Sequence, residues 1–175
     1  MGCLPHSLTK GQLKMSRIVT RANLTANDSS AKEQLGKLFV DYKDGKIYRY
    51  VLVEDAALAV GDVVEYSDAT GYEVTNDRSG GASLGRFVAG VAVGTITDAY
   101  YGWIQVSGVH TAVKTDGAVA LGEGLVPHAT ADGQADTEAA GSTVAVTSGQ
   151  VFGFALATDS GTTSAGTVAA MIRCL

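Results

Sequence analysis

The residues of this sequence that could do chemistry are few and widely spaced. The three histidines are His6, His110 and His128. None belongs to a His-x-His, His-Glu-x-x-His or Cys-x-x-Cys pattern, the spacings typical of zinc sites. Ser107 precedes His110 by three residues, but residues three apart on an extended chain face opposite sides, so no serine–histidine dyad is expected. The sequence therefore predicts no catalytic residue, no metal site, no cofactor and no enzyme.

The acidic residues and the cysteines also favour structural roles. A calcium site within residues 132–136 is an alternative, because turns can supply several oxygen ligands. Cys3 and Cys174 lie near the two ends, so they match neither a disulfide framework nor a metal-ligand spacing. Two free thiols or a single long-range bridge both stay open. The acidic residues fall at predicted turns, where we expect hydrated carboxylates: Asp55, Asp62, Asp68, Glu123, Asp132 and Asp136.

Composition indicates one compact β-rich domain with an additional arm. The chain has 175 residues, of which 46% are apolar and 22 are glycine, against a usual glycine share of about 7%. Val, Thr, Ala and Gly dominate, as in short strands joined by many turns. The net charge is −5, and no run of basic residues exceeds two, so nucleic acid is not an expected partner. No apolar stretch reaches the 18 residues that a membrane helix needs.

Two hairpins stand out in the pattern. Residues 37–42 and 46–53 flank Asp44-Gly45, a favourable hairpin turn. Residues 87–96 and 103–107 form a second pair of predicted strands around the connection 97–102. This second hairpin contains Trp103, the only tryptophan. For core or subunit packing we expect five aromatic residues: Phe87, Tyr101, Trp103, Phe152 and Phe154.

The chain contains an internal duplication, with quasi-repeats at about 57–108 and 118–172. Ala57-Leu-Ala-Val-Gly-Asp-Val-Val matches Ala118-Val-Ala-Leu-Gly-Glu-Gly-Leu, and Val88-Ala-Gly-Val-Ala matches Val151-Phe-Gly-Phe-Ala. Four matched segments keep their order, which favours two β-rich halves related by a pseudo-twofold. In this alignment Trp103 stands where Thr167 stands in the second half. The glycine of each Ala-x-Gly-acid turn can take positive φ, and the acid is expected to stay in water.

Residues 1–37 differ from the β-rich domain predicted over 38–175. Basic residues are concentrated in this stretch, and residues 27–35 resemble either a capped short helix or a polar linker. Two interpretations stay open: a floppy terminus, or an arm that becomes ordered on a partner.

The repeated units resemble the capsid decoration (cement, or head-stabilising) proteins of tailed bacteriophages. The similarity lies in Phe87-Val-Ala-Gly-Val-Ala-Val-Gly, Tyr101-Gly-Trp-Ile-Gln-Val-Ser-Gly-Val, Ala120-Leu-Gly-Glu-Gly-Leu-Val and Phe152-Gly-Phe-Ala-Leu. It covers about residues 57–175. It implies an all-β fold of the barrel or tulip type, with a sandwich as the alternative. The extended N-terminal arm expected before this domain is a departure from the family.

The resemblance also implies a role. It implies homotrimers on the outer capsid surface, at threefold or quasi-threefold positions, that bridge subunits of the major capsid protein. The protein would be assembled in the host bacterial cytoplasm and would have no catalytic residues. The N-terminal arm could grip the capsid through four basic residues: Arg17, Arg21, Lys32 and Lys37.

Two other function classes make different demands on the sequence. A receptor- or carbohydrate-binding module of a phage spike or fibre would need exposed aromatic side chains, and Tyr100, Tyr101 and Trp103 are the candidates. A core position for Trp103 would count against that interpretation. A small hydrolase would need a nucleophile and a base in catalytic geometry, and the sequence does not indicate such a pair.

Overall fold

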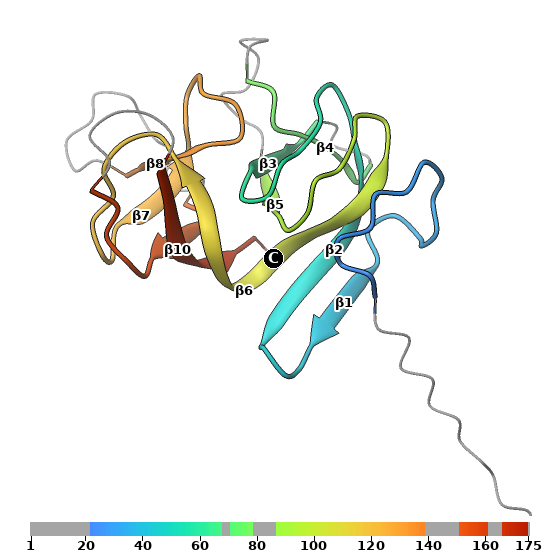
Figure 1. Ribbon diagram of the computed structural model, residues 1–175, viewed down its shortest axis with the longest axis horizontal. Coiled ribbons are helices and arrows are strands. Elements are labelled where there is room, and N and C mark those ends of the chain that lie inside the picture. The colour runs from blue at the N-terminus through green and yellow to red at the C-terminus, as the bar shows by residue number, and fades with distance from the viewer. Residues whose placement is uncertain (1–21, 68–70, 79–86, 139–150, 161–165, 175) are drawn as a thin grey trace, which may run out of the picture.

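The fold is described from a computed structural model, for residues 22–67, 71–78, 87–138, 151–160 and 166–174. Within these ranges the chain forms strands, turns and irregular segments and no helix, as the composition predicts. The strands are β1 Leu38–Asp41, β2 Lys46–Val53, β3 Val63–Tyr66, β4 Glu73–Thr75, β5 Val88–Ala92, β6 Tyr101–Thr115, β7 Gly124–Pro127, β8 Ala135–Thr137, β9 Gly153–Ala155 and β10 Gly166–Arg173 (Figure 1).

Five strands close into a first barrel. The ring runs β2–β4–β3–β5–β6 and returns to β2, and all its pairs are antiparallel except β2–β4. The predicted first hairpin is confirmed, because β1 and β2 pair around Gly45, whose φ is +64°. The second predicted hairpin is also confirmed in the β5–β6 pair, although β6 continues to Thr115.

A second ring repeats the first and shares β6 with it. It runs β6–β8–β7–β9–β10 and returns to β6, again with one parallel pair, β6–β8. We call the two rings barrel 1 and barrel 2. The first half of β6 pairs with β2 and completes barrel 1. The second half of β6 pairs with β10, and in barrel 2 it occupies the position that β2 occupies in barrel 1. The 15 residues of β6 therefore join the two barrels covalently.

The same local devices build each barrel, so the predicted pseudo-duplication is confirmed. Gly61 and Gly122 have φ of +86° and +87° in equivalent turns. A Cβ on Gly90 or on Gly153 would lie 2.5 Å from a carbonyl oxygen of the neighbouring strand, so both strands need glycine there. In both turns the acid side chain accepts a hydrogen bond of 2.7 Å from the backbone N–H three residues earlier.

The strand register corrects one detail of the alignment. Ala92 pairs with Ile104 in barrel 1, and its equivalent Ala155 pairs with Ala170 in barrel 2. Trp103 therefore corresponds to Ala169 and not to Thr167. The sequence alignment is displaced by two residues at this point. The reason is that the connection between the two paired strands differs in length between barrel 1 and barrel 2, and the spacing of the glycines does not reveal this difference.

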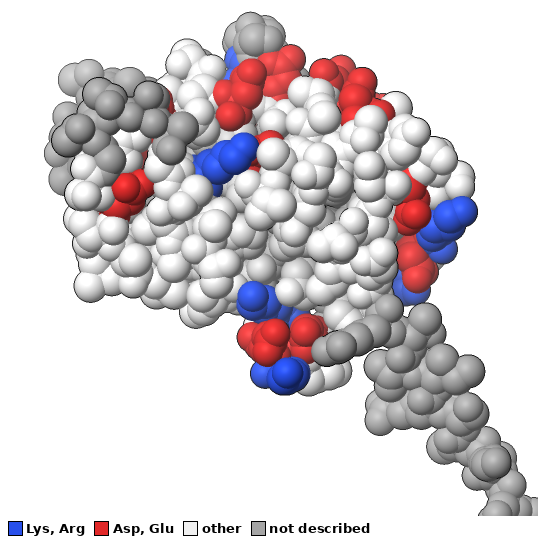
Figure 2. All heavy atoms as spheres, viewed as in Figure 1, with Lys and Arg blue, Asp and Glu red and all other residues white. Residues whose placement is uncertain are grey.

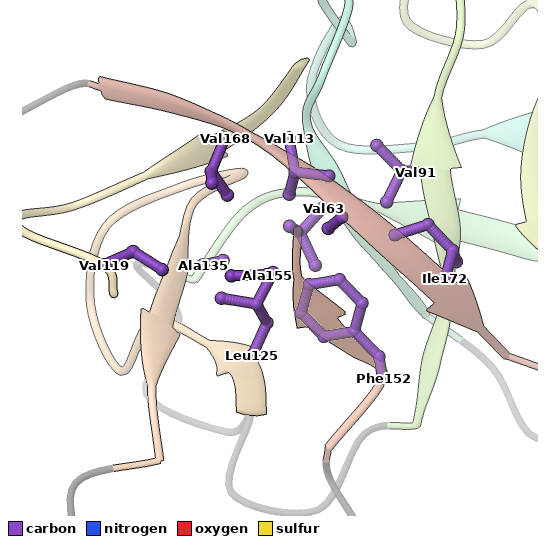
Figure 3. Close-up of a cluster of buried hydrophobic side chains, with 11 residues drawn as sticks. Val63, Val91, Val113, Val119, Leu125, Ala135, Phe152, Ala155, Val168 and Ile172 are labelled. Carbon is purple, nitrogen blue, oxygen red and sulfur yellow. The ribbon is translucent and has the colours of Figure 1, made fainter. Parts of the chain in front are cut away.

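Each barrel has its own apolar core, and barrel 1 also contributes to the core of barrel 2. The side chains of Val63 and Val91 lie on the outer side of barrel 1. They pack in the cluster that contains Leu125, Phe152 and Ile172 (Figure 3). The inner side of barrel 1 holds a separate cluster around Val64 and Ile104. The two barrels consequently form one packed body.

Residues 22–37 form an irregular segment that covers barrel 1. Residues 27–35 contain no helix, so the capped-helix alternative is wrong. Asp28 forms a β-bridge with Tyr101, and Gly36 N donates to Tyr50 O at 2.8 Å. Apolar side chains of this segment, among them Leu24 and Leu35, pack with Tyr48, Tyr50 and Trp103. Residues 1–21, which complete the predicted arm, lie outside the described part of the chain.

Candidate functional site

The two described histidines, His110 and His128, make hydrogen bonds to the backbone of the fold. His110 lies buried on β6, and its Nδ1 accepts a hydrogen bond of 3.2 Å from Ala112 N. Burial lowers the pKa of His110, while a hydrogen bond to the Ala92 backbone acts in the opposite direction. The Nδ1 of His128 accepts from the N–H groups of Thr130 and Ala131, which places its proton on Nε2, 3.0 Å from Asp116 Oδ2.

Cys174 is a free thiol against the core. Burial raises its pKa to about 12, so the reactive thiolate is scarce at neutral pH. Its predicted alternative partner, Cys3, lies outside the described residues. Gly81-Ala-Ser-Leu-Gly85 matches the Gly-x-Ser-x-Gly pattern of a nucleophile elbow, and it also lies outside the described residues. The next described element is the strand β5, whereas an elbow leads into a helix.

The acidic turn residues do not behave alike. Asp62 is buried, which corrects the expectation of a hydrated carboxylate, because its turn packs against barrel 2. Its carboxylate accepts from Ala59 N and Asn76 Nδ2, and lies 2.6 Å from Lys114 Nζ. The equivalent Glu123 is exposed, as expected. Asp132 Oδ1 accepts from Arg78 N at 2.7 Å, and the described residues hold no group of three or more candidate metal ligands.

A buried ion pair lies beside the contact between the barrels. Arg78 Nη2 bonds the Glu65 carboxylate, and both side chains are largely excluded from water. Such a pair fixes orientation more than it adds stability, because removing both charges from water costs about as much as their attraction returns. Together with Asp62 and Lys114, this ion pair positions the loops at the contact between barrel 1 and barrel 2.

The predicted aromatic residues divide into buried and exposed sets. Trp103 packs edge-on to Tyr50, with ring centroids 5.2 Å apart, and Phe152 lies in the core of barrel 2. Tyr101 is half-buried and stacks on Tyr50. Phe87 and Phe154 are 73% and 50% exposed, so neither packs in the core of this chain. For Phe87 and Phe154, packing against another subunit stays a prediction.

The two predicted capsid-binding lysines that the structure describes lie on the segment 22–37. Lys32 is exposed, and its Nζ donates to Ser30 Oγ at 3.1 Å. Lys37 is exposed and forms an ion pair with Glu33. Figure 2 shows Lys and Arg beside Asp and Glu at the right and lower edges of the molecule, and mostly Asp and Glu along its upper edge. Arg17 and Arg21 lie outside the described residues.

One apolar surface of the described residues belongs to barrel 2. On the outer side of the β9–β10 pair, Phe154 lies directly opposite Met171, and Met171 lies opposite Val109 of β6. Leu156 comes directly after β9, and Leu121 projects from the adjacent turn. We call these five residues the barrel 2 outer face. The sequence signal was present in Phe154, but its exposure could not be predicted before the strand register was known.

Comparison with known proteins assigns no family. No family model matches the chain, and no curated protein matches it. One similar solved structure is the N base of the head fiber gp8.5 of bacteriophage phi29, with 14% sequence identity and a TM-score of 0.47. The match covers 73% of this chain and 93% of that chain. Values this low assign no function. No helix in the described residues is long and apolar enough to cross a membrane.

Proposed function

We propose that this chain is a non-enzymatic structural protein of a tailed-phage virion. In this proposal it binds the outer surface of the head as a homotrimer and stabilises the shell by bridging major capsid subunits at threefold or quasi-threefold positions. It needs no cofactor and contacts neither nucleic acid nor membrane. The repeated motifs, similar to those of decoration proteins over residues 57–175, are the origin of the proposal.

The observation that carries the proposal is the use of the reactive residues. His110 and His128 each hold backbone N–H groups through Nδ1, and Cys174 packs against the core. Side chains committed to these structural bonds favour a binding protein over an enzyme. Exposed Phe87 and Phe154 offer apolar contacts of the kind that protein interfaces use.

The carbohydrate-binding alternative receives less support. It requires Tyr100, Tyr101 and Trp103 to present their rings to a sugar. Trp103 is instead buried beneath residues 22–37, and the two tyrosines are half-buried.

Co-sedimentation with empty, expanded capsids tests the proposal. We expect saturable binding, at a stoichiometry equal to the number of threefold and quasi-threefold positions. Removal of residues 1–21, which eliminates Arg17 and Arg21, should weaken binding without unfolding either barrel. The double variant Lys32→Ala/Lys37→Ala should also weaken binding, and increasingly so at low salt, because exposed charge contacts are screened by salt.

A matched control removes the same charge elsewhere. Lys43→Ala/Lys46→Ala changes two lysines of the β1–β2 hairpin and should leave capsid binding unchanged. Unsaturable binding to capsids, or micromolar binding to a glycan array in place of capsids, would contradict the proposal.

A further inference from the structure

The two barrels expose equivalent surfaces to very different degrees. In barrel 1 the outer row formed by Val63, Val91 and Gln105 is buried, and its two valines pack in the core of barrel 2. The equivalent row in barrel 2 is Gly124, Phe154 and Met171, in the same antiparallel register. Phe154 is 50% exposed and Met171 is 41% exposed, whereas Val91 and Gln105 are at most 1% exposed. The same surface of the repeat is thus covered in barrel 1 and exposed in barrel 2.

The turns next to these rows differ in the same way. Gly61 O accepts a hydrogen bond of 2.9 Å from Lys114 N, and a Cβ on Gly61 would meet Ala112 O at 2.2 Å. Gly122 has nothing within 4 Å of the equivalent position, and Leu121 beside it is 66% exposed. The turn of barrel 1 is therefore packed against the next unit, whereas the turn of barrel 2 meets no further unit in the described part of the chain.

The opposite side of barrel 1 is already covered. Residues 22–37 and Phe39 of β1 pack over Tyr50 and Trp103. Among the described residues, the units thus follow one another as covering segment, barrel 1 and barrel 2, and the outer row of barrel 2 has no further unit packed over it. In repeat arrays a terminal unit with no successor normally carries a polar outer side. The barrel 2 outer face is apolar instead.

We propose that a second copy of this chain covers the barrel 2 outer face, namely Val109, Leu121, Phe154, Leu156 and Met171. The contact would extend to a second molecule the kind of packing that joins barrel 1 to barrel 2. The five side chains carry no charge, so an identical copy can approach without bringing like charges together. Glu123 and Arg173, both exposed, flank the face in sequence and supply polar groups for a rim.

The proposal does not depend on capsid binding. It concerns contacts between copies of the protein alone in solution, so its failure would count against the homotrimer of the proposed function but would leave capsid binding itself in place. Conversely, a chain that self-associates but binds no capsid would contradict only the virion function.

Analytical ultracentrifugation of the full chain, without capsids, tests the contact. We expect wild-type protein to sediment as an oligomer. Phe154→Glu should raise the dissociation constant at least ~10-fold, because a charge would be buried at the centre of the contact. Leu121→Glu should act in the same direction, and its open turn keeps it compatible with folding.

A matched control is Val60→Glu. Val60 is the exposed residue of the equivalent turn in barrel 1 and lies outside the face, so this variant should keep the wild-type mass. Far-UV circular dichroism checks that each variant is folded. A monomeric wild-type chain would overturn the proposal, even if Phe154→Glu then weakened capsid binding. Folded Phe154→Glu and Leu121→Glu variants that keep the wild-type mass would overturn it as well.

Discussion

At the scale of single residues, the duplication provides pairs in which the same residue type meets different surroundings. Gly61 and Gly122 share a left-handed backbone conformation, but only at Gly61 would an added Cβ meet the backbone of a neighbouring strand. The acids that follow them show the same contrast, since Asp62 is buried with Lys114 and Glu123 stays exposed. The contact between the barrels, and not the turn itself, therefore determines what each residue contributes to stability.

The glycine pair allows this distinction to be measured. Gly61→Ala and Gly122→Ala should each destabilise the protein by about 1–2 kcal/mol, because an L-residue is strained at positive φ. Gly61→Ala should cost roughly 1–3 kcal/mol more, because its methyl group overlaps Ala112 O and forces a backbone shift. Chemical denaturation of both variants gives the two free energies of unfolding. Equal losses would mean that the turn of barrel 1 is not packed as described.

At the scale of elements, residues 22–37 belong with barrel 1. They bridge to Tyr101, bond Tyr50 through the backbone and pack over Trp103. Sequence composition groups them with the basic N-terminal stretch, because their polar residues are typical of a linker. Their few apolar side chains contact residues far away in the sequence, and only the folded chain brings these together.

Truncation separates the two parts of the N-terminal stretch. Deletion of residues 1–37 should expose the single tryptophan, shift its fluorescence emission to the red and lower the melting temperature. The reason is that this deletion removes the side chains and backbone groups that cover Trp103 and Tyr50. Deletion of residues 1–21 is the control and should change neither property. Identical emission from the two truncated proteins would show that residues 22–37 do not cover Trp103 in solution.

At the scale of the whole molecule, the two barrels should unfold together. They share β6, and Val63 and Val91 of barrel 1 lie in the core of barrel 2. Loss of barrel 2 would consequently expose part of barrel 1 as well.

A core substitution in barrel 2 tests this coupling from barrel 1. Phe152→Ala should lower the free energy of unfolding by about 3–5 kcal/mol, the usual cost of deleting a buried phenylalanine ring. Denaturation followed by Trp103 fluorescence, a probe of barrel 1, should shift by as much as denaturation followed by circular dichroism. Phe87→Ala, at an exposed site, should stay within about 0.5 kcal/mol of wild type. An unshifted fluorescence transition would indicate that the barrels unfold independently.

Much of the architecture could be predicted from the sequence, because it depends on local patterns. Asp44-Gly45 marks the first hairpin, and Gly61 and Gly122 mark equivalent turns whose positive φ glycine accommodates best. Gly90 and Gly153 mark strands that approach a neighbouring backbone closely. Composition and the ordered repeats were sufficient for the all-β class and the duplication.

The surfaces were decided by tertiary structure alone. Phe152 and Phe154 are two residues apart on the same short stretch, yet one fills the core of barrel 2 and the other faces outward. Val91 and Phe154 occupy equivalent strand positions, but only Val91 has a barrel packed over it. The sequence by itself determined which segments become strands and turns, since backbone geometry and periodicity are local properties. Which copy of each surface is covered depends on how the two barrels share β6, and that arrangement exists only in the folded chain.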